Sequence, residues 1–199
     1  MKAIITEHDV EQGTDRWLAI RADRYTGTDA DKLLRFGRIP YILISKGANA
    51  FGGNYWTKRG HLLEEKAISL YERIKGVVVR RPGFITNSLY EMAGYSPDGL
   101  TDLILIEVKC FDKKKHLKMW HGDVPFKVLA QIHFGLFITG RKVAHLLIYN
   151  PEFAKKDDPD YDPKLAFKII VIKHSPAIAA NFKRILTEEN NYATHPQAA

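Results

Sequence analysis

The sequence lacks the features that mark secreted or membrane-spanning proteins. It has one cysteine, Cys110, among 199 residues, which excludes an internal disulfide framework and is typical of a reducing compartment. No apolar run approaches the ~20 residues that a membrane-spanning helix needs. Residues 1–12 show no apolar core of a secretory signal. We therefore expect a cytoplasmic location and no membrane partner.

Signatures of nucleotide-dependent and zinc-dependent enzymes are also missing. The glycine-rich segment 46–54 is followed by no Lys-Ser or Lys-Thr pair, so it is not a phosphate-binding P-loop. The eight histidines show no His-Glu-x-x-His or similar spacing, and we expect no zinc site. Internal repeats are absent too. The length suits one domain over residues 1–199, with residues 193–199 as a frayed tail.

Charge is unevenly distributed along the chain. The formal net charge is +7, from 30 Lys and Arg residues against 23 Asp and Glu residues. Basic residues cluster at 35–38, 58–59, 80–81 and 113–118, whereas acidic residues gather at 157–162. This asymmetry indicates one basic face, and such a face favours polyanions, nucleic acid before a membrane surface.

Helical and strand-like segments are mixed along the chain. The periodicity of apolar residues and the positions of Gly and Pro predict helices at residues 15–24, 26–37, 56–76, 125–140 and 175–192, and strands at residues 76–87, 103–110, 143–149 and 165–175. This order favours an α/β domain with a mixed central sheet flanked by helices.

The stretch 96–110, SPDGLTDLILIEVKC, places charged residues beside a buried strand. Glu107 and Lys109 face the same side of that strand because side chains alternate. Asp98 lies in a Pro-Asp-Gly turn just before it. If the strand returns along the segment that precedes the turn, Asp98 lies beside Glu107.

Two carboxylates at contact distance repel each other unless a cation lies between them. Their oxygens are the ligands that Mg²⁺ prefers, and a neighbouring lysine can orient or deprotonate a water or stabilise charge on a phosphate. The alternative interpretation is a surface hairpin with a cross-strand salt bridge. The apolar neighbours of Glu107 favour a cleft instead.

The Pro-Asp and Glu-x-Lys elements resemble the PD-(D/E)xK nuclease core. More narrowly, SPDGL and IEVKC resemble the phage alkaline exonucleases of the lambda exonuclease (YqaJ-like recombinase) family. Residues 11–30, 60–67 and 129–140 are similar to three further segments of that family: its Gln-Gly-Trp-Arg-Thr block, its G-x-x-x-E-x-x-A helix and its glutamine-bearing helix. The resemblance covers about residues 11–150, in the family's order.

The resemblance implies a restriction-endonuclease-like PD-(D/E)xK fold and a metal site. Asp98, Glu107 and the main-chain carbonyl of Val108 match the ligands of one ion, and Lys109 matches the catalytic lysine. Glu64 matches a further carboxylate, which with Asp98 holds a second ion. The implied cofactor is Mg²⁺, two ions per active site, with Mn²⁺ as a possible substitute.

Three further residues have counterparts in the family. Gln131 matches the active-site glutamine, and Arg21 and Thr28 match the pocket for a 5′-terminal phosphate. Thr28 is also expected to begin a helix, whose free N–H groups favour phosphate. Helical register assigns the family's glutamate to Glu64, which shares a face with apolar positions, and leaves Glu65 as a solvated charge.

The implied activity is Mg²⁺-dependent digestion of linear double-stranded DNA from 5′ ends, which leaves 3′ single strands for annealing. The implied assembly is a homotrimeric ring around DNA, with a single-strand annealing protein as a further partner, in the cytoplasm of a bacterium that hosts a phage or prophage. An endonuclease of restriction or junction type with the same core stays open. A non-catalytic DNA-binding module is disfavoured, because binding gains little from carboxylates that face phosphates.

Overall fold

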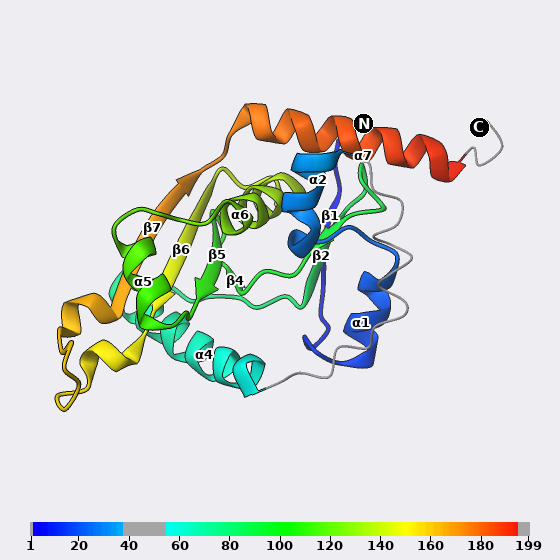
Figure 1. Ribbon diagram of the computed structural model, residues 1–199. Helices are drawn as coiled ribbons and strands as arrows, with labels where there is room; N and C mark the ends of the chain where they lie inside the picture. The colour runs from blue at the N-terminus through cyan, green and yellow to red at the C-terminus, as the bar shows by residue number, and fades with distance from the viewer. Residues whose placement is uncertain (1, 38–54, 195–199) are drawn as a thin grey trace.

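The computed structural model describes residues 2–37 and 55–194 (Figure 1). Its helices are α1 (Asp15–Ala22), α2 (Ala30–Phe36), α4 (Tyr55–Lys75), α5 (Lys113–Trp120), α6 (Phe126–Thr139) and α7 (Pro176–Thr194), and its short 3₁₀ helices are η1 (Gly27–Asp29), η2 (Pro151–Ala154) and η3 (Pro163–Ala166). Its strands are β1 (Ile5–His8), β2 (Phe84–Asn87), β3 (Gly94–Tyr95), β4 (Gly99–Leu100), β5 (Ile104–Lys109), β6 (Val143–Tyr149) and β7 (Phe167–Lys173). This is the mixed α/β fold that the sequence predicts.

The described strands form two sheets. One has the order β1-β2-β3 and is antiparallel throughout. The other has the order β4-β5-β6-β7, in which β5 and β6 run parallel and the outer pairs run antiparallel. A parallel pair requires a crossover connection, and here α5 and α6 supply it.

Helices cover both faces of the larger sheet. Ile106 and Val108 of β5 pack with Ala67 and Ile68 of α4 on one face. Leu105, which points to the other face, packs in the core that α6 contributes. Figure 1 shows α4 and α6 on opposite sides of these strands. Because α6 also contacts β2 and β3, it joins the two sheets.

Helix α6 is the apolar centre of the fold. It follows Pro125 and ends before Gly140, whose positive φ of 71° closes the helix in the left-handed conformation. Phe134 of α6 packs edge-on against Phe182 of α7, with ring centroids 5.0 Å apart. Within the described ranges, no helix has both the length and the apolarity to cross a membrane.

The predicted helix 26–37 is divided in the structure. Asp29 Oδ2 accepts hydrogen bonds from the Thr26 N–H at 2.8 Å and from the Thr26 hydroxyl at 2.9 Å. This closed turn forms η1, and α2 begins only at Ala30. The prediction that Thr28 begins the helix is therefore wrong: Thr28 is an exposed residue within η1.

Two strand predictions also differ from the structure. In segment 76–87 only β2 is a strand, and the preceding residues contribute a single antiparallel bridge between Arg80 and Leu100. Val78, expected in a strand, is 82% exposed. Strand β1 was not predicted, because four residues with three polar side chains carry little periodic signal.

One expectation falls wholly, and another partly, outside the described residues. The glycine-rich segment 46–54 lies outside them. Of the expected tail 193–199, the first two residues continue α7 to Thr194, and the remainder lies outside the described residues.

Candidate active site

The corner between β4 and β5 brings the two strand carboxylates together. Gly99 pairs with Ile106, so the residue before β4 lies opposite Glu107. Asp98 Oδ2 accepts a hydrogen bond from the Val108 N–H at 2.6 Å. The antiparallel return that the sequence suggested thus places Asp98 beside the end of β5.

Glu107 is completely buried and binds three donors. Tyr95 donates its hydroxyl to Oε2 at 2.5 Å. Lys109 Nζ and Gln131 Nε2 both donate to Oε1, at 2.5 and 2.6 Å. A buried carboxylate is tolerated only with such partners. Since Glu107 is 0% exposed, the surface-hairpin interpretation is excluded.

Negative charge is concentrated around Asp98. Burial, and then the carboxylates of Glu107 and Glu64, raise the pKa of Asp98 well above its usual range, while Lys109 and the Val108 N–H oppose the rise. Burial lowers the pKa of Lys109, but the carboxylates of Glu107 and Asp98 outweigh it and raise that pKa overall. In the described part of the chain, the ammonium of Lys109 therefore acts on the carboxylates of Asp98, Glu107 and Glu64 together.

Helix α4 supplies the third carboxylate as its register predicts. Ala67 and Ile68 are fully buried against β5, and Glu64, one turn earlier, is half-buried and acts electrostatically on the cluster. Glu65 points outward: its side chain is 62% exposed and pairs with Arg81. The structure thus assigns Glu64, not Glu65, to the carboxylate cluster.

The carboxylate oxygens of the cluster are ligands that suit a hard divalent cation, but their present arrangement is not that of a preformed metal site. In the described part of the chain, no three or more His, Cys, Asp or Glu side chains are grouped so that they could hold a metal ion. Both oxygens of Glu107 accept hydrogen bonds from protein groups. However, burial, and then the carboxylates of Glu107 and Glu64, raise the pKa of Asp98, and a bound cation would oppose both causes by favouring the charged carboxylate. Binding at Oε1 of Glu107 requires Lys109 and Gln131 to release that oxygen.

Arg21 reaches the same region from α1. Its Nη1 donates to Ser96 Oγ at 2.8 Å, and its guanidinium carbon lies 3.9 Å from the ring centroid of Trp17. Trp17 Nε1 also donates to Ser96 Oγ, at 3.0 Å. Burial lowers the pKa of Arg21 to about 10, and Asp29 opposes the change, so the guanidinium stays cationic at neutral pH. The guanidinium is thereby held at Ser96, which precedes Asp98 by two residues in the sequence.

The structure does not join Thr28 to Arg21. Thr28 Oγ1 lies 3.0 Å from Thr26 Oγ1, and the hydrogen bond of Arg21 goes to Ser96 instead. Helix α2 has only seven residues. Of the two residues expected to bind phosphate, Arg21 is hydrogen-bonded to Ser96, which precedes Asp98 by two residues in the sequence, and Thr28 is an exposed residue of η1.

A comparison with models of protein families identifies the family of this chain. The model of one family, the YqaJ-like viral recombinase domain, matches residues 16–142. The chain belongs to this family. The match includes the carboxylate cluster, Lys109, Gln131 and Arg21.

Solved structures have the same fold as this YqaJ-like domain. A structure of LHK-Exo in complex with dAMP superposes with a TM-score of 0.69 at 21% identity, over 94% of this chain and 100% of that chain. The alkaline exonuclease (LHK-Exo) from Laribacter hongkongensis gives 0.68 at 23% identity, over 93% and 98%. A phage related exonuclease from Haemophilus somnus 129PT gives 0.53 at 18% identity, over 90% and 81%. A search of curated proteins found no match. The predicted PD-(D/E)xK fold is confirmed.

Three residues of the site in this YqaJ-like domain were not predicted as such. Tyr95 and Ser96 directly precede the Pro-Asp turn, and that position is the only signal that the sequence offers for them. No motif in the sequence marks Trp17 individually, yet it hydrogen-bonds Ser96 and stacks on Arg21.

The basic cluster at 113–118 is partly neutralised in the YqaJ-like domain. It forms most of α5, whose first residue, Lys113, pairs with Asp158 and with Asp160, the latter at 2.9 Å. The acidic segment 157–162 therefore covers one end of the basic cluster. The exposed lysines that remain on α5 are Lys114, Lys115 and Lys118.

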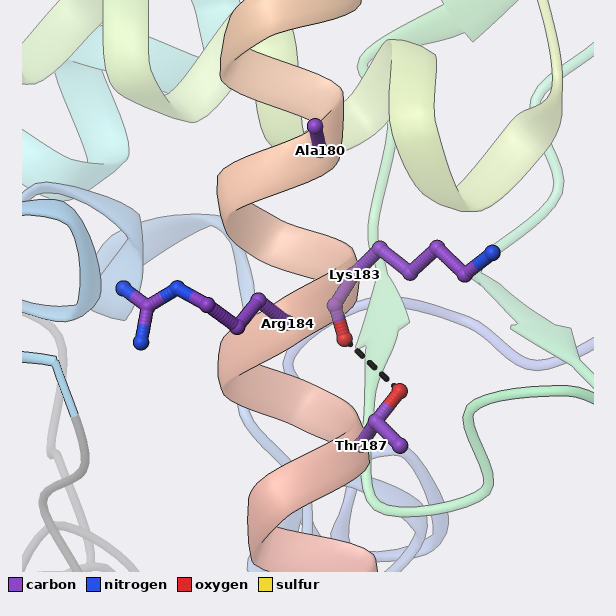
Figure 2. A pocket seen from close by; sticks show the side chains of 4 residues that line it. All are labelled: Ala180, Lys183, Arg184 and Thr187. Carbon is purple, nitrogen blue, oxygen red and sulfur yellow. Dashed lines mark hydrogen bonds between the residues drawn. The ribbon is translucent and has the colours of Figure 1, made fainter.

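A hollow lies along α7, outside the residues that match the YqaJ-like domain (Figure 2). Its described lining consists of Ala180, Lys183, Arg184 and Thr187, and the hydroxyl of Thr187 donates to the Lys183 carbonyl at 2.8 Å. All four residues belong to one helix and none is a carboxylate, so the hollow is not part of the carboxylate site.

Proposed function

We propose that the chain is a Mg²⁺-dependent exonuclease that digests linear double-stranded DNA from 5′ ends and leaves 3′ single strands. The observation that carries the proposal is the fully buried Glu107 beside Asp98 and Lys109 at the end of β5. Membership of a viral recombinase family and a fold shared with alkaline exonucleases support it.

Asp98, Glu107 and the Val108 carbonyl would hold one Mg²⁺, and Glu64 with Asp98 would hold a second, with Mn²⁺ as a substitute. When bound, the ions would supply Lewis-acid stabilisation of the attacking and leaving oxygens of a phosphodiester. Burial and the neighbouring carboxylates of Glu107 and Glu64 make a charged Asp98 costly, as its raised pKa indicates, and a bound divalent ion would favour the charged form.

The remaining residues of the site would position the attacking water and stabilise charge on the phosphate. Lys109 is an ammonium at neutral pH, since the neighbouring carboxylates raise its pKa despite burial. Once it releases Oε1 of Glu107, it is placed to donate to a water or to a phosphate oxygen. Gln131, which is half-buried and donates to the same oxygen, would orient the attacking water.

A linear duplex distinguishes the proposal from its rivals. With Mg²⁺ present, a duplex labelled at each 5′ end should release its label first, leave 3′ overhangs and stay intact in EDTA. A covalently closed circle should remain uncut, and a nicked or linearised circle would indicate an endonuclease instead. DNA binding without any cleavage would indicate a binding module.

End recognition is assigned to Arg21. A 5′-terminal phosphate carries more charge than an internal phosphodiester, and a guanidinium suits its oxygens. We expect Arg21→Ala to reduce the preference for 5′-phosphorylated over 5′-hydroxyl DNA by roughly tenfold to a hundredfold, the scale of one charged hydrogen bond. The measurement is the ratio of initial rates on the two substrates.

The control for Arg21 lies on the same helix. Arg16 of α1 is exposed, and Arg16→Ala should keep the wild-type ratio. An unchanged ratio in Arg21→Ala would remove Arg21 from the phosphate pocket, and a wild-type ratio near one would contradict a 5′-phosphate pocket altogether.

The assembly belongs to the same proposal. A homotrimeric ring would hold the duplex, an annealing protein would take up the 3′ strand, and both would act in the bacterial cytoplasm. Sedimentation equilibrium of the full chain, with and without DNA, tests the trimer directly.

A further inference from the structure

Tyr95 holds one oxygen of Glu107 from the interior of the protein. Its hydroxyl donates to Oε2, whereas Lys109 and Gln131 both donate to Oε1. The two oxygens are therefore held by different kinds of group. One is bound to a rigid phenol, and the other to a flexible ammonium and an amide.

The ring of Tyr95 is fixed in a slot between two glycines. The residue is 1% exposed. A methyl group added at Gly27 would lie 2.7 Å from Cε2 of the ring, and one at Gly135 would lie 2.6 Å from Cζ. Both distances are far below the ~3.5 Å of ordinary contact between carbon atoms. The close approach of both backbones therefore prevents the hydroxyl from moving away from Oε2.

In contrast to Tyr95, the two side chains that donate hydrogen bonds to Oε1 of Glu107 can move away from it. The side chain of Lys109 is 20% exposed and Gln131 is half-buried. Both are long chains with several rotatable bonds. Of the two oxygens of Glu107, Oε1 is thus the one at which a cation can replace the protein's own donors.

We propose that Tyr95 is a positioning residue that fixes the Glu107 carboxylate so that Oε1 alone faces a bound divalent cation. The inference rests on the proposed function, in which Glu107 is a metal ligand. Without the hydroxyl, Oε2 of a fully buried carboxylate would lose its donor, and the carboxylate could turn away from its position.

Tyr95→Phe tests this role because it keeps the ring and removes only the hydroxyl. By titration calorimetry without DNA, Mg²⁺ should bind roughly tenfold to a hundredfold more weakly than to the wild type, the usual effect of losing a group that orients a ligand. The nuclease rate should be low at limiting Mg²⁺ and return toward the wild-type kcat at saturating Mg²⁺. DNA affinity in EDTA should be unchanged.

Tyr71 provides a matched control on the other face of the sheet. It is 2% exposed, and its hydroxyl lies 2.8 Å from His145 Nδ1. Tyr71→Phe therefore also removes one buried hydroxyl, but it should leave Mg²⁺ affinity unchanged. An equal loss in both variants would mean a general effect on the fold and would overturn the proposal.

The remaining outcomes separate this inference from the proposed function. Mg²⁺ affinity of Tyr95→Phe within twofold of the wild type would overturn the role of Tyr95. If Tyr95→Phe does not fold, Gly135→Ala, which displaces the ring but keeps the hydroxyl, should show the same loss, and unchanged affinity there overturns the role. A wild type that binds Mg²⁺ yet leaves DNA intact would contradict the proposed function, while weaker binding by Tyr95→Phe would still support the positioning role.

Discussion

Asp98→Asn is expected to cleave DNA about 10³-fold more slowly than the wild type, or slower still, a loss at or above that caused by removing one electrostatic group from an active site. In EDTA the variant is also expected to melt at a higher temperature than the wild type. Cleavage is lost because the amide cannot supply the charge that a divalent cation needs. Its oxygen can still accept the Val108 N–H, so the turn should keep its geometry.

The gain in stability follows from the raised pKa of Asp98. A carboxyl with a raised pKa binds its proton more tightly in the folded protein than in the unfolded chain. The free energy of unfolding therefore falls as pH rises from the unfolded pKa, about 3.9, toward the folded one. The neutral amide does not contribute to this fall, so the difference in melting temperature should be larger near pH 7 than at pH 4.

Calorimetric melting and a linear-duplex assay measure the two effects together. Mg²⁺ should raise the melting temperature of the wild type more than that of Asp98→Asn. Asp102, whose side chain is 96% exposed in the turn between β4 and β5, gives the matched control, and Asp102→Asn should change neither property. Near-normal cleavage by Asp98→Asn would contradict the assignment of the site.

Lys109→Met is expected to lose cleavage by roughly 10²- to 10⁴-fold and, unlike Asp98→Asn, to lose stability in EDTA. Lys109 is the cation that pairs with the buried Glu107. Removing one partner of such a pair leaves an uncompensated charge and costs roughly 3–5 kcal/mol. Mg²⁺ should restore part of that loss, since it would neutralise the same carboxylate.

Single-turnover kinetics at saturating Mg²⁺ separate the chemical step from folding in Lys109→Met. Lys173 of β7 is exposed on an edge strand, and Lys173→Met should keep both cleavage and stability. A Lys109→Met protein that folds in Mg²⁺ and cleaves at close to the wild-type rate would show that Lys109 only compensates the charge of Glu107.

The site residues that follow a local pattern could be predicted from the sequence. Alternation along residues 103–110 correctly separated Glu107 from Ile106 and Val108. Helical register distinguished Glu64 from Glu65 in the same way. In both cases the side-chain direction depends on a period of two or 3.6 residues, which a sequence displays directly.

Residues whose role depends on docking between distant segments could not be predicted. Tyr95 belongs to one sheet and Glu107 to the other, so their contact follows from how α6 joins the sheets. Both Thr26 and Thr28 are suitable residues to begin the helical segment. The structure selects Thr26, because Asp29 accepts hydrogen bonds from its N–H and its hydroxyl. Composition alone also gave no sign that Lys113 would meet the acidic segment.

The bond between Tyr95 and Glu107 has a consequence for the newly synthesised protein. A chain that emerges from the ribosome contains β3, β4 and β5 before α6 has been made, and α6 carries both Gln131 and the Gly135 wall of the tyrosine slot. Until that helix packs, Tyr95 is not confined and Glu107 lacks one of its three donors. Truncated or partly folded chains therefore contain the acidic residues without their organisation, and we expect them to leave nearby nucleic acid unharmed.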